Sequence, residues 1–486
     1  MVFSSHLFLF YFLPLTLILY YALPKKAKHL GLTLLSYVFY GWANPIFVVL
    51  MLTSTLIDYS CGLVIDRQDV RIRAGEQSFG RTVTIRRGTL KKAALIVSIV
   101  TNLSLLGFFK YFNFFIDSYN AVLSAIGLED DTVRFGFKVA LPLGISFYTF
   151  QSMSYTIDLY KGKVQVMKNF VDFACYVSLF PQLVAGPIIR FSEVADQLRS
   201  RTHTFEKFAR GFAFLAMGLA KKVLLANPCG KIADLAFGTA GIPVHTAWYG
   251  IIGYAFQIYY DFSGYSDMAI GLGLMLGFVF PKNFDSPYLS KSITEFWRRW
   301  HLSLSHWLRD YLYIPLGGNK KGNLRTYVNL SLVMLLGGLW HGASWNFIIW
   351  GGLHGTLLVF ERFNGKKPLY SGMPGAARTF FTFVLILFTW VFFRADTLGG
   401  AIGYLRSMFA LAPVNESAHL IDSVIYNPYY VIMFASAIVL TWFGRQTWDW
   451  TKTITAKKAA VIGVLFVVSV LILTTQSFNP FIYFIF

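Results

Sequence analysis

Long apolar runs alternate with short polar stretches along the whole chain. A membrane-spanning helix needs about 20 mostly apolar residues. Runs near that length lie at 7–23, 93–116, 138–160, 208–227, 246–260, 267–280, 328–340, 346–360, 379–393, 428–443 and 459–475, and two shorter ones fill 30–66 on either side of Asn44-Pro45. The pattern predicts an all-α polytopic membrane protein, a single membrane-embedded domain over 1–486 with roughly 11–12 transmembrane helices.

The apolar segment 170–190 differs from the others because it contains Pro181, Gly186 and Pro187. Irregular backbone at membrane depth is tolerated only where protein or a water-filled cavity surrounds it. We therefore expect a re-entrant segment here. The first run is expected to stay as an uncleaved span, because no Lys or Arg precedes it and no small-residue cleavage site follows it.

Composition supports the membrane interpretation. The chain is 55% hydrophobic and 14% charged, whereas a soluble protein has about 25% charged residues. This excludes disordered, collagen-like and coiled-coil proteins and argues against a soluble enzyme. The three cysteines, Cys61, Cys175 and Cys229, lie in apolar stretches. They predict buried small side chains, with no disulfide framework and no metal site.

The net charge of +19 is concentrated in short loops. Segments 67–92 and 281–325 each hold eight basic residues, against two and three acidic ones, which places both on the cytoplasmic side of the membrane. The stretch 117–137 is acidic and is expected to be a periplasmic loop. Basic loops on anionic lipid account for the charge, so membrane lipid is the expected partner and nucleic acid is not.

Within 281–325, an amphipathic pattern predicts an interfacial helix that Pro315 and Gly317-Gly318 end. His301 would share a face of this helix with Trp297 and Ser305, while His306 would point elsewhere in a structural role. Two roles remain open for Arg298 and Arg299, which could hold a phosphorylated donor or lipid headgroups. The apolar stripe of this helix consists of Trp297, Trp300, Leu304, Trp307, Leu308 and Tyr311.

His341 lies in a stretch without charged residues, GGLWHGASW at 337–345. Desolvation favours its neutral imidazole, which can act as a general base. Gly337, Gly338 and Gly342 would let a ligand or another backbone approach closely. The alternative is a histidine that ties two helices together through a hydrogen bond.

Two further groups of polar residues have open interpretations. Asn346, Trp350 and His354 fall on one helical face, where they could line a cavity or anchor packing. Asp261 and Asp267 could form a carboxylate pair, although Ser266 or Asp267 as the cap of a helix starting at Met268 is the simpler account. No GxSxG, Walker A or HExxH motif is present, so hydrolase, ATPase and metalloprotease functions lack support.

Several long motifs, in order, resemble the membrane-bound O-acyltransferase family, and within it the bacterial alginate O-acetylation proteins. They cover the chain almost end to end. They are MVFSS and FLF at its start, LPLGISFYTFQSMSYTIDLYKG at 141–162, FPQLVAGPIIR at 180–190, YYDFSGYSDMAIGLGLMLGF at 259–278, ITEFWRRWHLSLSHWLRDYLYIPLGGN at 293–319, LWHGASWNFIIWGGLHG at 339–355 and QSFNPFIYFIF at 476–486.

The resemblance implies spanning, re-entrant and interfacial helices around a funnel or tunnel. It implies acyl transfer from a cytoplasmic donor towards a hydroxyl on the other side. The WHG histidine of the family falls on His341 and the FWRRWH histidine on His301, so both are expected to be catalytic. The residues expected to line the substrate path are Asn346, Trp340, Trp297, Arg298, Arg299 and His354.

The expected reaction is O-acetylation of an exopolysaccharide such as alginate, with acetyl-CoA as donor and no permanently bound cofactor. His341 would activate the accepting hydroxyl or carry the acetyl group, and Asn346 or a backbone N–H near Gly342 would stabilise the oxyanion. A separate periplasmic serine-dependent acetyltransferase is the implied partner. Alternatives are the same chemistry on peptidoglycan, cellulose or teichoic acid, and a non-catalytic transporter or scaffold.

Overall fold

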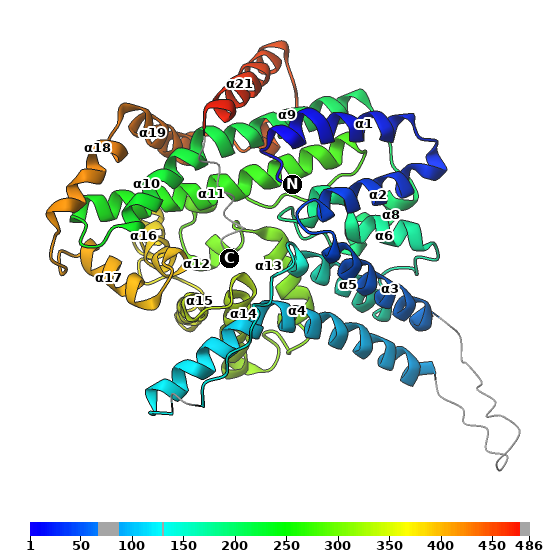
Figure 1. Ribbon diagram of the computed structural model, residues 1–486, viewed down its shortest axis with the longest axis horizontal. Coiled ribbons are helices and arrows are strands. Elements are labelled where there is room, and N and C mark those ends of the chain that lie inside the picture. The colour runs from blue at the N-terminus through cyan, green and yellow to red at the C-terminus, as the bar shows by residue number, and fades with distance from the viewer. Residues whose placement is uncertain (67–86, 129–130, 477–486) are drawn as a thin grey trace, which may run out of the picture. The chain divides into compact units, whose positions relative to one another are not determined.

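In the computed structural model, the described residues are 1–66, 87–128 and 131–476, and within them every regular element is a helix (Figure 1). The predicted all-α class is confirmed. The chain divides into two compact units. The first comprises residues 1, 10–184 and 188–202, and the second comprises 2–9, 185–187 and the chain from His203 on.

The first unit contains the N-terminal helices. A π-helical turn, η1 (Leu7–Phe12), of which residues 7–9 belong to the second unit, runs directly into α1 (Leu13–Ala22), so the apolar run at 7–23 is one helix as predicted. The other elements are η2 (Lys25–Ala27), α2 (Lys28–Gly41), α3 (Ile46–Asp66), α4 (Arg87–Ala125), α5 (Ile145–Tyr160), α6 (Phe170–Ser178), α7 (Phe180–Leu183) and α8 (Phe191–Arg199).

The second unit begins with α9 (Phe205–Ala220), η4 (Lys221–Ala226), α10 (Asn227–Gly238) and α11 (Val244–Met275). Short elements follow: η5 (Pro287–Leu289), α12 (Ile293–Trp297), α13 (Leu302–Leu308) and η6 (Arg309–Tyr313). The last group is α14 (Gly322–His341), α15 (Trp345–Phe363), α16 (Gly375–Arg394), α17 (Leu398–Met408), η7 (Glu416–Ile421), α18 (Asp422–Ile425), α19 (Pro428–Phe443), α20 (Thr447–Trp450) and α21 (Ala456–Thr475).

Four helices of the described chain are long and apolar enough to cross a membrane: Ile46–Asp66, Gly88–Ala125, Gly375–Arg394 and Ala456–Thr475. A fifth is added if the pair Glu416–Ile425 and Pro428–Phe443, bent by 72°, counts as one span. The protein is therefore a multi-pass membrane protein. The larger total of 11–12 spans stays a prediction.

The predicted helix boundaries on either side of the expected periplasmic loop 117–137 were wrong. Helix α4 continues to Ala125, and α5 starts only at Ile145, not at 138. The connecting chain folds back along the extended helix, because the Asn120 side chain exchanges two hydrogen bonds with the backbone of Val133 and Asn113 does the same with Val139. These bonds stabilise helix where the acidic composition suggested loop. Residues 67–86 of the expected cytoplasmic loop 67–92 lie outside the described chain.

The segment 170–190 is broken as predicted. Helices α6 and α7 are separated at Leu179, and the non-helical chain after α7 is buried. The Phe180 N–H, freed by the break, donates to Ser36 Oγ at 3.1 Å. Irregular backbone is thus satisfied by a neighbouring helix.

The two runs expected at 246–260 and 267–280 form one helix instead, α11, so neither Ser266 nor Asp267 caps a helix. Helix α11 lies along α9 (Figure 1), and a Cβ on Gly218 would come within 2.5 Å of the Gly264 carbonyl oxygen. The two acids also do not pair with each other. Asp267 lies 2.6 Å from Lys221 Nζ, and Asp261 lies 2.8 Å from Lys222 Nζ.

The prediction of a single interfacial helix within 281–325 was also wrong. The chain there forms α12, α13 and η6, with a break at Arg298–His301 and a left-handed backbone at His301 (φ 42°). The break is stabilised by the non-helical segment 283–285. The Asp285 N–H donates to the Arg299 carbonyl oxygen, and the Leu302 N–H donates to the Asn283 carbonyl oxygen. His301 therefore does not share a helical face with Trp297 and Ser305.

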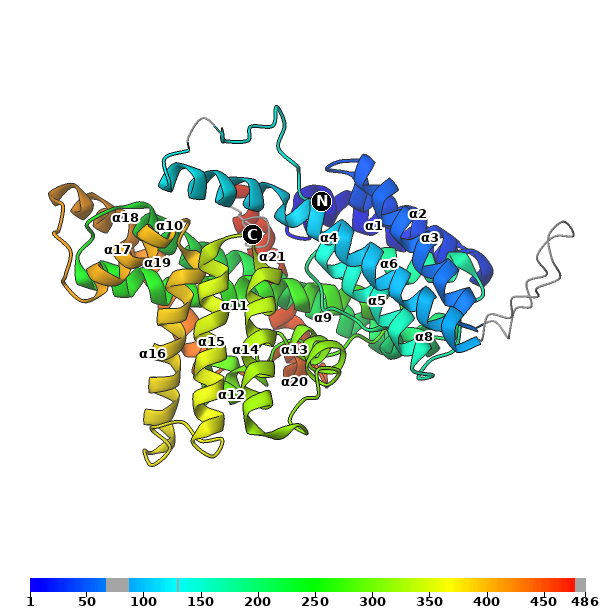
Figure 2. The same cartoon turned by 90° about the horizontal axis from the view of Figure 1, so that it is seen from below.

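Helices α14 and α15 form an antiparallel hairpin, and α16 packs against α15 (Figure 2). Close approach depends on glycine, because a Cβ on Gly338 would lie 2.2 Å from the Phe347 carbonyl oxygen and one on Gly351 would lie 2.4 Å from that of Met334. The predicted close backbone approach at Gly338 is confirmed. The hairpin places His341, at the end of α14, beside Trp350 of α15.

Candidate functional site

A cavity of about 860 Å³ lies inside the second unit, within the size range of small-molecule sites. One wall follows α14 from Leu330 through Met334 and Gly337 to His341. These positions lie on one face of the helix, and at 1.5 Å per residue the wall is roughly 16 Å long. The cavity is therefore elongated, with His341 at one end.

His341 is 9% exposed and is held in an aromatic cage. Its ring lies 5.0 Å from the Trp340 ring, 5.2 Å from that of Trp350 and 5.2 Å from that of Phe393, with each pair close to perpendicular. Rigid rings on three sides restrict the orientation of the imidazole. Of the two histidines expected to be catalytic, this one reaches the cavity.

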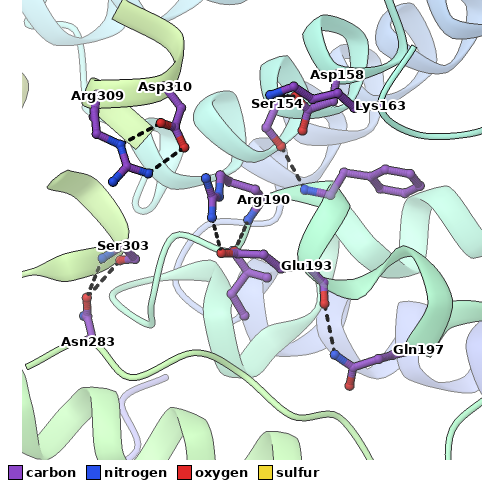
Figure 3. Close-up of polar contacts among 12 residues, drawn as sticks. Ser154, Asp158, Lys163, Arg190, Glu193, Gln197, Asn283, Ser303, Arg309 and Asp310 are labelled. Atoms are coloured by element: carbon purple, nitrogen blue, oxygen red, sulfur yellow. Dashed lines mark hydrogen bonds and ion pairs between the residues drawn. The ribbon is translucent and has the colours of Figure 1, made fainter. Parts of the chain in front are cut away.

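The other end of the cavity is basic. Because α14 and α15 are antiparallel, Arg362 and Lys366 lie at the end remote from His341, and Arg298, His306 and Arg309 from the α12–η6 region also line the cavity. Arg309 is partly neutralised, since its Nε donates to Asp310 Oδ1 at 2.7 Å (Figure 3). A cationic end and a histidine end suit an elongated ligand whose charged group is anionic.

Helix α12 is fixed to α15 by a buried carboxylate. Glu361 is 4% exposed and accepts hydrogen bonds from the Ile293 and Thr294 N–H groups, at 2.7 and 2.9 Å. These are the first N–H groups of α12, which have no partner within the helix. The carboxylate thereby sets the position of Trp297 and Arg298, which both line the cavity.

His301 is buried behind the cavity and does not line it. Asn283 Oδ1 lies 3.1 Å from His301 Nδ1 and accepts from the Ser303 N–H and hydroxyl (Figure 3), while Asn283 Nδ2 donates to Ser266. This arrangement places the proton of the neutral ring on Nδ1. His301 Nε2 then presents a lone pair that no described residue satisfies. Burial lowers the pKa of His301 to about 3, so the ring is neutral.

His354 is also fully buried and is not in the cavity wall. Trp297 Nε1 donates to His354 Nδ1 at 3.2 Å, and the Trp350 ring lies 4.8 Å from the His354 ring. His354 therefore packs in the protein interior and is anchored there by one hydrogen bond, which is one of the two alternatives that the sequence left open. Its role is to fix Trp297, which does line the cavity.

Three other residues that were expected to line the substrate path are not in the wall of this cavity. Asn346 Nδ2 donates to the Ala395 carbonyl at 2.6 Å, which joins α15 to the end of α16 and gives no support to an oxyanion role. Arg299 binds Glu295 and the Asp285 carbonyl oxygen. Trp340 packs between the His301 and His341 rings, with centroids 6.1 and 5.0 Å away.

The sequence missed several lining residues. His306 was expected to be structural, yet it lines the cavity, as does Tyr313. Arg362 and Lys366 were not singled out. A signal existed for Arg362, since it lies on α15 eight positions beyond His354 and near the end of the apolar run. Helix pairing was needed to bring it into the cavity wall.

In the described part of the chain, no three His, Cys, Asp or Glu side chains gather closely enough to hold a metal ion. Cys61, Cys175 and Cys229 are free and buried, as predicted.

Comparison with known proteins gives a consistent result. The model of MBOAT, the membrane-bound O-acyltransferase family, matches residues 159–367, a range that contains all residues lining the cavity. A probable alginate O-acetylase AlgI of Pseudomonas putida is 42% identical, with all of both chains covered. The peptidoglycan O-acetyltransferase of Helicobacter pylori is 34% identical, covering all of this chain and 97% of its own. The teichoic acid D-alanyltransferase of Bacillus subtilis is 29% identical, covering 52% of this chain and 67% of its own.

Proposed function

This chain belongs to the membrane-bound O-acyltransferase family, and we propose that it takes an acetyl group from a cytoplasmic donor, acetyl-CoA, and passes it across the inner membrane for O-acetylation of an exopolysaccharide such as alginate. The family and its acetyltransferase relatives make it an O-acyltransferase. The donor, the direction of transfer and the acceptor belong to the proposal.

One observation carries the proposal: a single elongated cavity joins a basic end to His341. The phosphates of CoA would bind at the basic end, near Arg362 and Lys366, where cationic groups recognise phosphate oxygens, and Arg298 lines the same cavity. The pantetheine arm would extend along α14 towards His341. Apolar walls such as Leu330 and Val333 would exclude bulk water and so protect the thioester from hydrolysis.

His341 acts as the general base in this scheme. It removes the proton from the accepting hydroxyl, whose oxygen forms a bond to the acetyl carbonyl carbon. The bond between that carbon and sulfur breaks, and the leaving thiolate takes up the proton from the imidazolium. The aromatic cage of Trp340, Trp350 and Phe393 holds the ring in the orientation that this transfer needs. Transient acetylation of His341 is the alternative step.

His301 remains part of the proposal as a positioning residue. It packs on Trp340, and Trp340 packs on His341. The resemblance also assigns the last transfer to a separate periplasmic serine-dependent acetyltransferase. Recovery of such a protein after mild cross-linking in native membranes, and its loss in a strain that lacks this chain, would support that assignment.

The test of the proposal measures ester-linked acetate on all extracellular and envelope glycans of the native host. A deletion strain is complemented with the intact gene, with His341→Ala, or with His419→Ala. His419 is a suitable control, because its side chain is 55% exposed and it does not line the cavity. All three proteins are adjusted to equal membrane abundance.

Loss of acetate from one glycan in His341→Ala alone supports the acyltransferase site and identifies the acceptor. Alginate is the expected glycan, and loss from peptidoglycan, cellulose or teichoic acid would correct the acceptor alone. Unchanged acetate in His341→Ala, with a phenotype for the deletion, would contradict the proposal and favour a transporter or scaffold.

A further inference from the structure

Three neighbouring helices of the first unit enclose a polar cluster that plays no part in the proposed reaction. Helices α3, α4 and α5 pack pairwise (Figure 1), and α3 and α4 are two of the candidate spans. Each contributes two polar side chains four residues apart, which therefore lie on one helical face. The six are Ser54 and Asp58 of α3, Ser98 and Asn102 of α4, and Ser152 and Thr156 of α5, none more than 2% exposed.

Asp58 is at the centre of this cluster. Its Oδ1 lies 2.6 Å from Ser98 Oγ, and its Oδ2 accepts from Asn102 Nδ2 at 2.8 Å. The orientation of the Asn102 amide is fixed, because its nitrogen also donates to the Ser98 carbonyl oxygen and its oxygen accepts from Ser54 Oγ. The carboxyl is thus held by neutral hydrogen-bonding groups.

No described Lys, Arg or His side chain forms an ion pair with Asp58. The titratable side chains that face it are the Cys61 thiol on α3 and the Tyr155 phenol on α5, and the described side chains of α2, α4 and α6 present no charge to it. A carboxylate at this depth would be a buried charge without a counter-charge, which is strongly unfavourable. Protonation removes that charge.

We propose that Asp58 is a proton-binding site within the membrane-embedded part of the protein, and that its carboxyl group carries a proton at neutral pH. Intramembrane ionisable side chains are rare and mark functional positions such as proton relays. The ligand of this site is the proton itself.

The hydrogen-bond network accepts this proton without rearrangement of heavy atoms. Asp58 Oδ1–H donates to Ser98 Oγ, and Ser98 donates to Thr156 Oγ1 at 2.9 Å. Thr156 donates to the Met153 carbonyl oxygen at 3.2 Å. In the ionised state Ser98 must donate to the carboxylate, so the two hydroxyl protons cannot serve all three contacts and either the Ser98–Thr156 or the Thr156–Met153 bond is lost. The protonated state therefore satisfies every hydroxyl along this chain of bonds.

A sodium ion is the other small cation that such oxygens could bind. The distances of 2.6–3.1 Å between the carboxyl and its hydrogen-bonding neighbours leave these atoms in direct contact with one another. Ser152 Oγ approaches the same carboxyl, but no atom lies at hydrogen-bonding geometry to it. A proton completes the network as it stands, whereas sodium would have to displace these bonds.

Infrared spectroscopy tests the proposal without requiring a reagent to reach the site. Spectra of the full-length protein in lipid nanodiscs are recorded at neutral pH for the wild type, Asp58→Asn and Asp158→Asn, in sodium-free and in sodium-containing buffer. Asp158 is the matched control, because it is equally buried but faces Lys163 Nζ at 3.9 Å.

Subtracting the spectrum of Asp58→Asn from that of the wild type should reveal the C=O stretch of a protonated carboxyl in both buffers. This band should show the usual shift to lower frequency in D₂O. The difference spectrum of wild type and Asp158→Asn is the control for loss of a buried carboxyl at another position of the same unit. Carboxylate bands in the difference spectrum of the wild type and Asp58→Asn would overturn the proposal. A protonated band that sodium abolishes also overturns it and makes sodium the occupant.

Thermal unfolding provides a second measurement. Asn resembles a neutral carboxylic acid in shape and can both donate and accept, so Asp58→Asn should keep a Tm near that of the wild type. Asp58→Ala leaves Asn102 and Ser98 without their partner and should lower the Tm by several degrees. Equal losses in the two variants would contradict a protonated Asp58.

Discussion

Trp297 Nε1 lies 3.2 Å from His354 Nδ1, and this contact determines which ring nitrogen of the neutral histidine carries the proton. An indole N–H can only donate, so Nδ1 accepts and the proton of the neutral ring is on Nε2. The bond connects a residue of the cavity wall to a buried residue of α15. It explains how a short helix such as α12 keeps its large aromatic side chain in one orientation.

Trp297→Phe should destabilise the protein by about 1–3 kcal/mol, because it leaves His354 Nδ1 buried without a donor while it preserves most of the ring packing. The measurement is the thermal unfolding of purified protein in detergent micelles. Trp442→Phe is the control, since Trp442 packs on the same core and makes no hydrogen bond with any described residue. Equal shifts in the two variants would show that the bond contributes nothing.

Gly351→Ala should disrupt the α14–α15 hairpin and reduce both folding yield and activity. Its Cβ would lie 2.4 Å from the Met334 carbonyl oxygen, so the backbones of α14 and α15 would have to move apart. Gly352→Ala is the matched control one residue away, because its nearest neighbour would be Leu335 Cδ2 at 3.7 Å. Similar yields of folded membrane protein for the two variants would contradict the close packing.

Arg362→Gln combined with Lys366→Gln should raise the KM for the acetyl donor roughly a hundredfold or more, because two charge-assisted bonds to phosphate are lost and each is worth about 1.5–3 kcal/mol. The kcat should change little, since these residues lie at the end of the cavity remote from His341. Acetyl transfer by purified protein is measured against donor concentration. Arg406→Gln, which alters a basic residue of α17 outside the cavity wall, should leave the KM unchanged.

Stability should fall as the pH drops below about 6.5, in part because of His301. Burial lowers the pKa of this side chain to about 3, whereas the unfolded chain binds the proton at its usual pKa near 6.5. The unfolded state therefore binds more protons between these values, and His301 contributes a slope of up to about 1.4 kcal/mol per pH unit.

His301→Asn removes this contribution and keeps a residue type that tolerates the left-handed backbone. Unfolding free energies measured between pH 4 and 6 should thus depend on pH less steeply in the variant than in the wild type, by about one proton. Parallel curves for the two proteins would refute the buried neutral histidine.

The sequence determined the membrane class and most helix positions. Runs of apolar residues cannot be placed elsewhere than in lipid or in a core, and this property is local. The helices at 345–363, 375–394, 428–443 and 456–475 were predicted to within four residues at each end for that reason, and the helix at 322–341 to within six. The motif around His341 also identified the histidine that the cavity reaches.

Tertiary contacts decided the rest. The helical spacing of Trp297, Trp300 and Leu304 indicated one helix, but Asn283 and the backbone of Asp285 bind the chain at 299–303 and break it there. Ser266 and Asp267 looked like a cap, but α11 continues because Gly218 and Gly264 allow α9 to pack against it. Hydrogen bonds between segments distant in the sequence leave no periodic signal.

The same distinction applies to the sites. The sequence singled out His341 and Arg298, whereas the contact of His301 with Trp340 and the presence of Arg362 in the cavity wall followed from helix pairing. Asp58, Ser98 and Thr156 are unremarkable in their separate apolar runs. Only the packing of α3, α4 and α5 brings them together, because a buried polar group is defined by its neighbours in space and not by those in sequence.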